Sequence, residues 1–206
     1  MKRWFLIAAA ATLLGVLPHP RTLADTDTQF RDAKATFDAA RARKAPAKDA
    51  VTQFSALLEL DPANPLLAAY RASAVVMQAR DAWLPWTKMK YLDDGLADMD
   101  RALGALKPAH EQANAGAPPV AMIVRLVAAN AFIAVPSFAN RGAEGRRLIR
   151  SLIASEGFAR TPASFRISAL ELAISSSTDA DAGRATWQQQ LGELKQSATV
   201  AKEVAP

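Results

Sequence analysis

One short segment, residues 50–65, constrains the fold of this chain more than any other stretch. Four of its residues lie at the spacing that puts them on one face of a helix: Ala50, Phe54, Leu57 and Leu58. Pro62 cannot continue that helix, and Asn64 followed by Pro65 starts the next one. The segment therefore predicts two helices joined by a tight turn.

The chain after residue 24 keeps this helical periodicity, and strand signals are almost absent. Apolar residues recur every three or four positions, and proline or glycine interrupts them at fairly regular intervals. We predict helices over these ranges: 28–42, 49–60, 66–82, 85–106, 118–134, 142–155, 162–175 and 179–195. Short loops favour antiparallel neighbours, so we expect an all-α fold of seven to eight helices, with antiparallel hairpins stacked as a short solenoid. The helical domain is expected over residues 25–195, with a disordered tail over residues 196–206.

The spacing of residues 50–65 recurs more weakly in a second segment: Gly95, Met99, Ala102 and Pro108. Both segments resemble the tetratricopeptide repeat (TPR), a helical hairpin with small, aromatic and proline residues at fixed positions. The chain is also similar to short exported TPR-like proteins of bacteria that carry a tryptophan-proline-lysine-tyrosine stretch after their second hairpin. This resemblance implies a TPR-like solenoid that serves as a protein-interaction scaffold. An insertion at residues 82–86 departs from a regular repeat array.

The first 24 residues have the layout of a secretory signal peptide. Two basic residues precede an uncharged run over residues 4–17, and we expect cleavage between Ala24 and Asp25. The run of 14 residues is shorter than the roughly 20 that a helix needs to span a bilayer, although an uncleaved anchor is the alternative. We therefore expect a periplasmic or secreted protein after removal of residues 1–24, without stable membrane insertion.

Composition argues against several classes of function. The chain has 25 Lys and Arg residues against 20 Asp and Glu residues, but three of the basic ones lie in residues 1–24, which leaves 22 against 20. This near balance gives no argument for a nucleic acid partner or for an anionic membrane. The chain has no cysteine, and His110 is its one histidine outside the predicted leader. We therefore expect no cofactor, no protein-held metal ion and no enzymatic activity.

The stretch from residue 80 to residue 91 has the most unusual local composition. It holds two tryptophans, one tyrosine, one proline and three cations in twelve residues. Tryptophan and tyrosine favour binding surfaces where a polar tip reaches a partner. Four of its side chains are therefore candidate binding residues: Trp83, Trp86, Lys88 and Tyr91. The alternative is that the two tryptophans fill the wide gap at the inserted turn.

Three arginines lie in helices otherwise lined by small or apolar residues: Arg71, Arg80 and Arg125. Each is expected to be partly buried and to need a partner. They are interpreted either as donors to a bound peptide or as members of ion pairs with Asp81, Asp93 or Asp94. Phe138 lies in a break between helices and is either a further candidate at the rim of the same groove or part of a plain loop.

Two charged clusters are interpreted as solvated helix faces. The acidic cluster comprises Asp93, Asp94, Asp98 and Asp100. The basic cluster comprises Arg141, Arg146, Arg147 and Arg150.

The leading hypothesis is a scaffold that binds a protein or peptide partner in the cell envelope through a concave groove. It predicts that four side chains converge on one concave surface: Trp83, Lys88, Tyr91 and Arg125. The alternative is a periplasmic small-molecule carrier associated with a transporter. That alternative requires an enclosed apolar pocket near three aromatic side chains: Trp83, Trp86 and Phe132.

Overall fold

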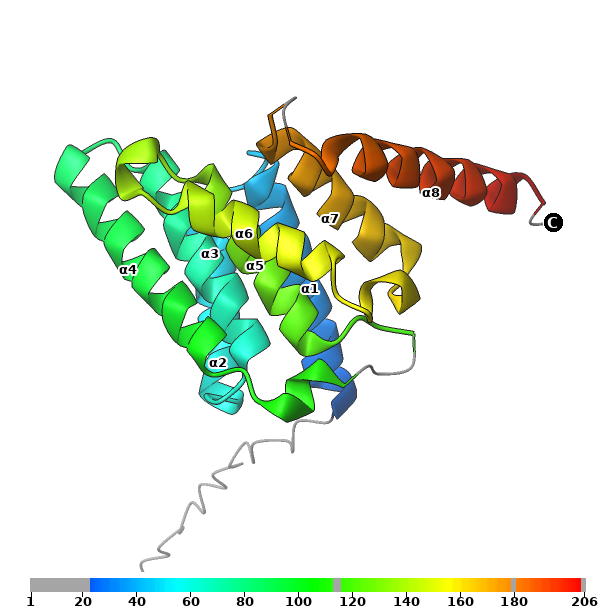
Figure 1. The fold of residues 1–206 in the computed structure, drawn as a ribbon. Coiled ribbons are helices and arrows are strands. Elements are labelled where there is room, and N and C mark those ends of the chain that lie inside the picture. The colour runs from blue at the N-terminus through cyan, green and yellow to red at the C-terminus, as the bar shows by residue number, and fades with distance from the viewer. Residues whose placement is uncertain (1–22, 113–115, 179–180, 205–206) are drawn as a thin grey trace, which may run out of the picture.

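The computed structural model describes residues 23–112, 116–178 and 181–204, which form a stack of helices (Figure 1). The described part contains eight α-helices: α1 (Leu23–Arg41), α2 (Ala47–Leu60), α3 (Pro65–Asp81), α4 (Pro85–Gly104), α5 (Val120–Ala134), α6 (Gly142–Ile153), α7 (Ala163–Ser176) and α8 (Arg184–Val204). Three short 3₁₀ helices lie in the connections: η1 (Pro108–Glu111), η2 (Ser137–Ala139) and η3 (Phe158–Arg160). These residues contain no β-strand, so the expected all-α fold is confirmed.

Consecutive helices pair as hairpins, α1 with α2, α3 with α4, α5 with α6 and α7 with α8. The turns inside the hairpins lie at the upper end of the stack in Figure 1. The connections between hairpins lie toward the opposite end, among them the α2–α3 turn and the α4–α5 connection that contains η1. The molecule therefore has one end formed by the turns inside the hairpins and an opposite end formed by the connections between hairpins.

Three of the hairpins bury the same spacing of residues in their second helices. The buried sets are Ala50, Phe54 and Leu57 in α2, Gly95, Met99 and Ala102 in α4, and Gly145, Ile149 and Leu152 in α6. A Cβ atom on Gly95 would lie 2.8 Å from the backbone nitrogen of Val76 in α3. One on Gly145 would lie 2.9 Å from the carbonyl oxygen of Ala129 in α5. The small first residue therefore lets the two helices of a hairpin approach closely. This spacing was predicted from the sequence in α2 and α4 but not in α6.

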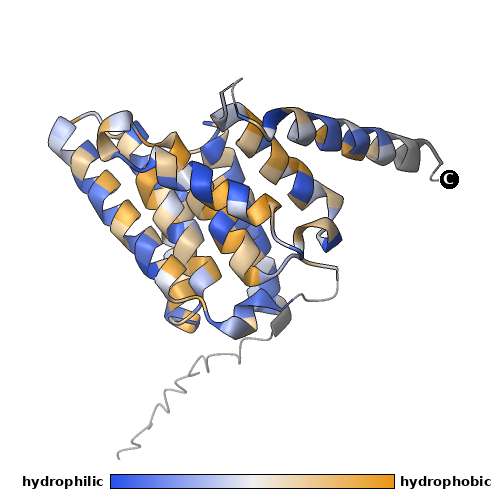
Figure 2. Cartoon of the chain, viewed as in Figure 1, coloured by the Kyte–Doolittle hydropathy of each residue, from blue (hydrophilic) through white to orange (hydrophobic). Residues whose placement is uncertain are grey.

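The interior consists of two hydrophobic clusters that share α5. The first spans α1 to α5 and contains an aromatic group in which the rings of Phe54 and Tyr70 stack with centroids 5.1 Å apart. Burial raises the pKa of Tyr70 to about 12. The second joins α5 to the last three helices around Ile149 and Leu170. Figure 2 shows the apolar residues of α5 in the middle of the stack, which is the position expected for a helix that is apolar nearly all round.

Local signals set the helix ends that frame the two ends of the molecule. The side-chain oxygen of Asn64 accepts hydrogen bonds from the backbone nitrogens of Leu66 and Leu67 at 3.0 and 3.3 Å, and Pro65 occupies the first position of α3. Pro85 starts α4 in the same way. The turn after α1 contains Arg43 with a φ of 59°, in the left-handed region that favours glycine.

The last helix reaches into the segment expected to be a disordered tail, residues 196–206. It extends to Val204, and residues 205–206 lie outside the described residues. Its later part is rich in residues of moderate to high helix propensity, and no proline interrupts it before residue 206. The predicted leader falls mostly on residues 1–22, outside the described residues, and α1 begins at Leu23. Within the described ranges, no helix combines the length and apolarity needed to cross a membrane.

Candidate functional sites

The predicted binding residues are distributed over both ends of the stack and do not converge. Trp83, Trp86 and Lys88 lie at the α3–α4 turn, at the upper end in Figure 1. The guanidinium of Arg125 instead pairs with Glu111 of η1, at the opposite end. Because α3 has 17 residues, about 25 Å of helix separates the two ends. The expected single surface that includes Trp83 and Arg125 is therefore wrong.

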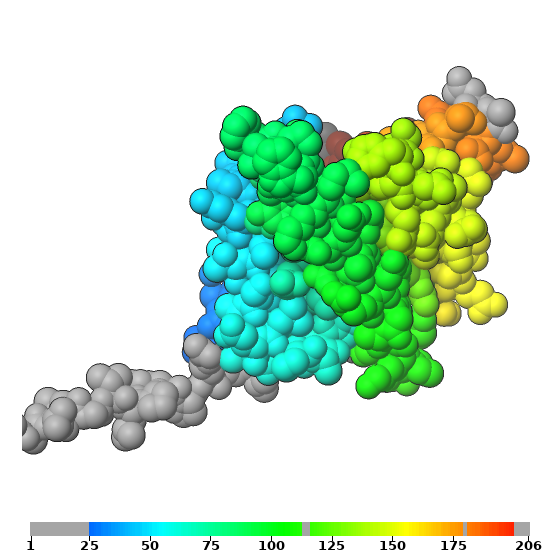
Figure 3. Space-filling model, turned by 90° about the vertical axis from the view of Figure 1, so that its left-hand side faces the viewer, coloured from blue at the N-terminus to red at the C-terminus, as the bar shows by residue number. Residues whose placement is uncertain are grey.

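Four large apolar side chains are exposed at the upper end. The exposed fraction is 85% for Trp83, 69% for Trp86, 65% for Phe138 and 42% for Met89. Figures 1 and 3 both place the α3–α4 turn and the α5–α6 turn, which contains Phe138, at this end. Among the described residues, Leu60 is the one other large apolar side chain with comparable exposure. We call the four residues the aromatic end.

The two tryptophans do not fill a gap in the interior. Both point into solvent, whereas Tyr91, one turn further along α4, packs against the first hydrophobic cluster. Trp86 lies in the first turn of α4, which begins at Pro85, whereas Trp83 lies in the short connection between α3 and α4. The aromatic end therefore protrudes from the start of α4 and from the turn before it.

Arg80 has a structural role beside the aromatic end. Its Nη2 donates to the carbonyl oxygen of Ala40 at 2.9 Å, and its Nε donates to Asp81 at 3.1 Å. Asp81 in turn accepts from the backbone nitrogen of Ala47 at 3.0 Å. The ion pair with Asp81 agrees with one of the two interpretations of the sequence. These bonds hold the α1–α2 turn against the end of α3, two residues before Trp83.

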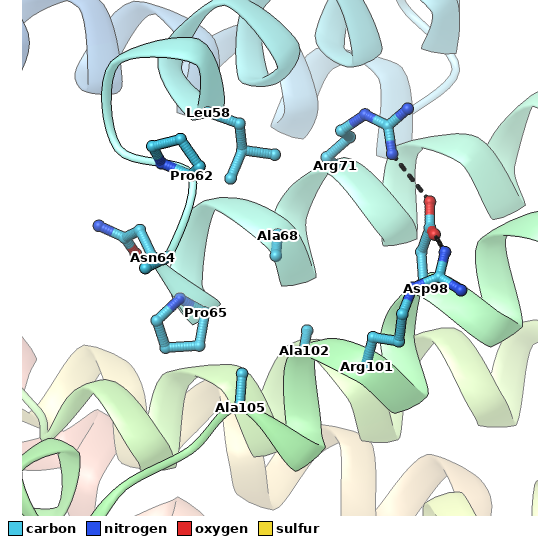
Figure 4. A pocket seen from close by; sticks show the side chains of 11 residues that line it. Leu58, Pro62, Asn64, Pro65, Ala68, Arg71, Asp98, Arg101, Ala102 and Ala105 are labelled. Atoms are coloured by element: carbon cyan, nitrogen blue, oxygen red, sulfur yellow. Dashed lines mark hydrogen bonds and ion pairs between the residues drawn. The ribbon is translucent and has the colours of Figure 1, made fainter.

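The opposite end contains a groove between α2 and α4, with α3 as its floor (Figure 4). Its volume is about 330 Å³, at the lower limit of the roughly 300–1,000 Å³ typical of ligand sites. Its walls are small and apolar, and their main residues are Leu58, Pro62, Pro65, Ala68, Ala102 and Ala105. We call this hollow the α2–α4 groove. It forms where the tight Pro62–Pro65 turn leaves α4 uncovered.

Two arginines and one carboxylate line one side of the groove. Asp98 accepts from Arg71 at 2.8 Å and also from Arg101. The Nε of Arg71 donates to the hydroxyl of Ser55 at 3.0 Å, which fixes the guanidinium between α2 and α4. The side chain of Asp98 is 19% exposed, whereas that of Arg101 is 73% exposed. Two guanidinium groups against one carboxylate leave an excess positive charge at this side of the groove.

The acidic cluster on α4 is not simply a solvated face. Asp98 binds the two arginines of the groove, and Asp100 accepts from both terminal nitrogens of Arg141 at 2.5 and 2.9 Å. Arg141 also lies with its guanidinium carbon 4.0 Å from the ring centroid of Phe132. Arg71 and Arg141 lie 27 and 41 residues from their carboxylate partners in sequence, so no local pattern could have identified these two pairs.

Arg125 and His110 lie in the same region, near the start of α5. The hydrogen bond from Arg125 lowers the pKa of Glu111. The Nδ1 atom of His110 accepts from the backbone nitrogen of Lys107 at 3.0 Å, so this histidine has a local structural partner. Within the described residues, no three acidic or histidine side chains gather closely enough to hold a metal ion.

The pocket required for a small-molecule carrier is not formed where it was expected. Trp83 and Trp86 are exposed, whereas Phe132 is fully buried in the first hydrophobic cluster. No protein-family model, curated protein or solved structure matches the chain. The candidate sites are therefore defined by geometry alone: the aromatic end and the α2–α4 groove.

Proposed function

We propose that the chain is an exported, TPR-like scaffold that binds a peptide segment of a partner protein in the cell envelope. In this proposal the peptide lies in the α2–α4 groove and the protein has no catalytic role. The observation that carries the proposal is the groove itself, a hollow of about 330 Å³ with apolar walls and two arginines that share one carboxylate.

The walls of the groove suit a chain with small or medium apolar side chains. Alanine and proline line most of its length, so the backbone of a bound segment can approach the helices closely. Arg101 has guanidinium N–H groups free in solvent, and these can donate to a carboxylate or to peptide carbonyls. Arg71 is already held by Ser55 and Asp98, so little side-chain freedom is lost when a ligand binds beside it.

Two further observations support the finer parts of the proposal. The buried spacing shared by α2, α4 and α6 supports a repeat architecture of the TPR type. The basic start and uncharged run of the first 24 residues support export. Amino-terminal sequencing of the protein from a periplasmic fraction tests export separately, and a start at Asp25 is the expected result.

A photo-crosslinking experiment tests the groove. We place a benzoylphenylalanine at position 105, on the exposed wall of the groove, in the full chain in cells, and a matched probe at position 185 on α8. A discrete adduct with an envelope protein is expected from position 105 and not from position 185. Adducts of equal yield at both positions, or none at position 105, would contradict the proposal.

A charge reversal shows whether the arginines take part. Arg101→Glu should lower the adduct yield about tenfold, because one good charge-assisted contact contributes roughly 1.4 kcal/mol or more. Arg147→Glu is the matched control, since Arg147 is also exposed but lies on α6, away from the groove. If the two variants behave alike, the arginine side of the groove does not recognise the partner.

A further inference from the structure

We propose that the aromatic end is a docking surface for an anionic lipid bilayer, with the rings of Trp83 and Trp86 at the level of the headgroups. The proposal concerns a different part of the molecule from the groove and does not depend on the proposed peptide binding. It rests on the shape of this surface, on the charges around it and on the backbone of one neighbouring turn.

The shape of the aromatic end suits a broad surface better than a chain. Its side chains protrude from the end of the stack, and the groove that could accept a peptide is lined by other residues. Tryptophan is the side chain most suited to the boundary between water and lipid, because its ring is apolar and its N–H can bind a polar group. Two protruding tryptophans can therefore enter a bilayer surface without any rearrangement of the helices.

The charges around the aromatic end are complementary to anionic lipid. Among the described residues, four exposed cations at this end make no ion pair: Arg43, Lys44, Lys48 and Lys88. Two exposed carboxylates at the same end, Asp49 and Asp93, also make none, while Asp81 and Asp94 are paired with Arg80 and Lys90. The unpaired charges at this end are therefore positive in sum. Cations held near a membrane surface attract anionic lipid headgroups.

Arg43 is a second, independent sign that this end is built to present cations. Its φ of 59° follows the last turn of α1, at a position where glycine is the usual residue. Its backbone nitrogen bonds to the carbonyl of Ala40 at 3.0 Å and that of Lys44 to Ala39 at 2.8 Å, so the turn is well ordered. An arginine in this conformation costs stability that glycine would not. The cost is explained if the cation has a role at this end.

Docking by this end would leave the rest of the molecule accessible. The α2–α4 groove lies toward the far end of α3, from Arg71, about 15 Å along the helix from Asp81, to Pro65, about 25 Å along it, and would face away from the bilayer. A bound lipid surface and a bound peptide would therefore not compete. The membrane contact is interfacial, since it uses side chains at a turn and requires no spanning helix.

The test measures quenching of Trp83 and Trp86 by lipid. In the full chain, Trp4→Phe and Trp187→Phe leave these two as the fluorescent tryptophans. Vesicles of phosphatidylglycerol mixed with brominated phosphatidylcholine should quench the emission and shift it to the blue. Vesicles of phosphatidylcholine alone, with the same brominated lipid, should do so at least about tenfold less effectively per mole of lipid. Because only the two tryptophans of the aromatic end are observed, binding through residues 1–24 cannot by itself produce the signal.

Charge variants complete the test. Substitution of glutamine for Arg43, Lys44 and Lys88 together should raise the lipid concentration at half-maximal quenching at least about tenfold, while Arg101→Gln at the opposite end should leave it unchanged. Arg43→Gly alone should weaken quenching and yet raise the thermal midpoint, which a structural role of the arginine would not do.

Three results would overturn the proposal: no quenching by anionic vesicles, equal quenching by anionic and neutral vesicles, or quenching that the triple variant does not change. Absence of quenching, together with an envelope protein whose capture is lost in Trp83→Ser/Trp86→Ser, would assign the surface to a protein partner instead.

Discussion

The two ends of α3 show different solutions to the placement of apolar and charged groups. At the groove end, small residues line a hollow, and the arginines at its side are held by Asp98. At the aromatic end, large rings protrude and several cations make no ion pair. A hollow with fixed donors suits a chain of defined geometry, whereas protruding rings among free cations suit a surface. This difference is the basis for proposing a separate occupant for each end.

If the exposed side chains at the aromatic end serve binding, the free energy of unfolding should depend on the buried interior and not on them. Phe54→Ala should lower the free energy of unfolding by about 3–5 kcal/mol, because a fully buried ring is removed from the aromatic group of the first cluster. Phe138→Ala also removes a phenylalanine ring, but an exposed one at the aromatic end, and should change the free energy of unfolding by less than about 0.5 kcal/mol. Urea denaturation checks both. Similar losses would show that the aromatic end is part of the core.

The two tyrosines of the chain sharpen this contrast through pH. The pKa of Tyr70 is raised from 10.0 to about 12 in the folded state by burial first and by the nearby Asp38 second. Its neutral form is thus favoured by folding, so this stability is complete below about pH 10 and is lost as the pH rises toward about 12. The loss should be about 3 kcal/mol in urea titrations across that window. Tyr70→Phe should abolish this loss and Tyr91→Phe should retain it. A loss that persists in Tyr70→Phe would assign it to another group.

Substitutions at two glycines test the packing of α4, one in its packed middle and one at its end near the groove. Gly95→Ala should destabilise the protein by about 1–3 kcal/mol, because the new Cβ would meet Val76 at 2.7–2.8 Å in α3. Gly104→Ala has no atom within 4 Å of the new Cβ and should be neutral or slightly stabilising. Thermal unfolding monitored by circular dichroism distinguishes them. Equal effects would mean that close helix approach does not depend on residue 95.

Substitutions at two aspartates of α4 measure how much the ion pairs of each end contribute to stability. Asp98→Asn should cost about 1 kcal/mol, because Arg71 and Arg101 lose their shared carboxylate at the groove. Asp94→Asn removes an exposed pair with Lys90 and should have no measurable effect on stability. High salt should shrink the difference, since the groove pair is itself partly exposed. The opposite ranking would show that the groove arginines are not held by Asp98.

Local sequence patterns predicted the helices and most of their ends. The apolar spacing of Ala50, Phe54 and Leu57 identified buried positions, and Pro65 and Pro85 marked the starts of helices. These signals succeed because they act over one or two helical turns. The tail over residues 196–206 was expected from its position at the end of the chain, and such a positional argument ignores the helix propensity of the residues that extend α8 to Val204.

The sites were only partly predictable. The unusual composition of residues 80–91 drew attention to Trp83 and Trp86, but sequence could not decide between interior and surface. Asp98 was missed because its partner Arg71 is 27 positions away, and such pairings are set by the packing of helices. Arg125 pairs with Glu111 at the end opposite Trp83. The predicted order of antiparallel helices already puts residue 125 toward that end, but a grouping of candidates by residue type does not use that order.

The division into two sites is tested most directly by the crosslink from position 105 in a Trp83→Ser/Trp86→Ser variant. If the groove and the aromatic end are separate, the adduct at position 105 keeps its identity and its yield, since the tryptophans lie about 25 Å away at the other end of α3. Loss of the adduct in this variant, with helicity and thermal midpoint unchanged, would contradict the division and restore a single composite site.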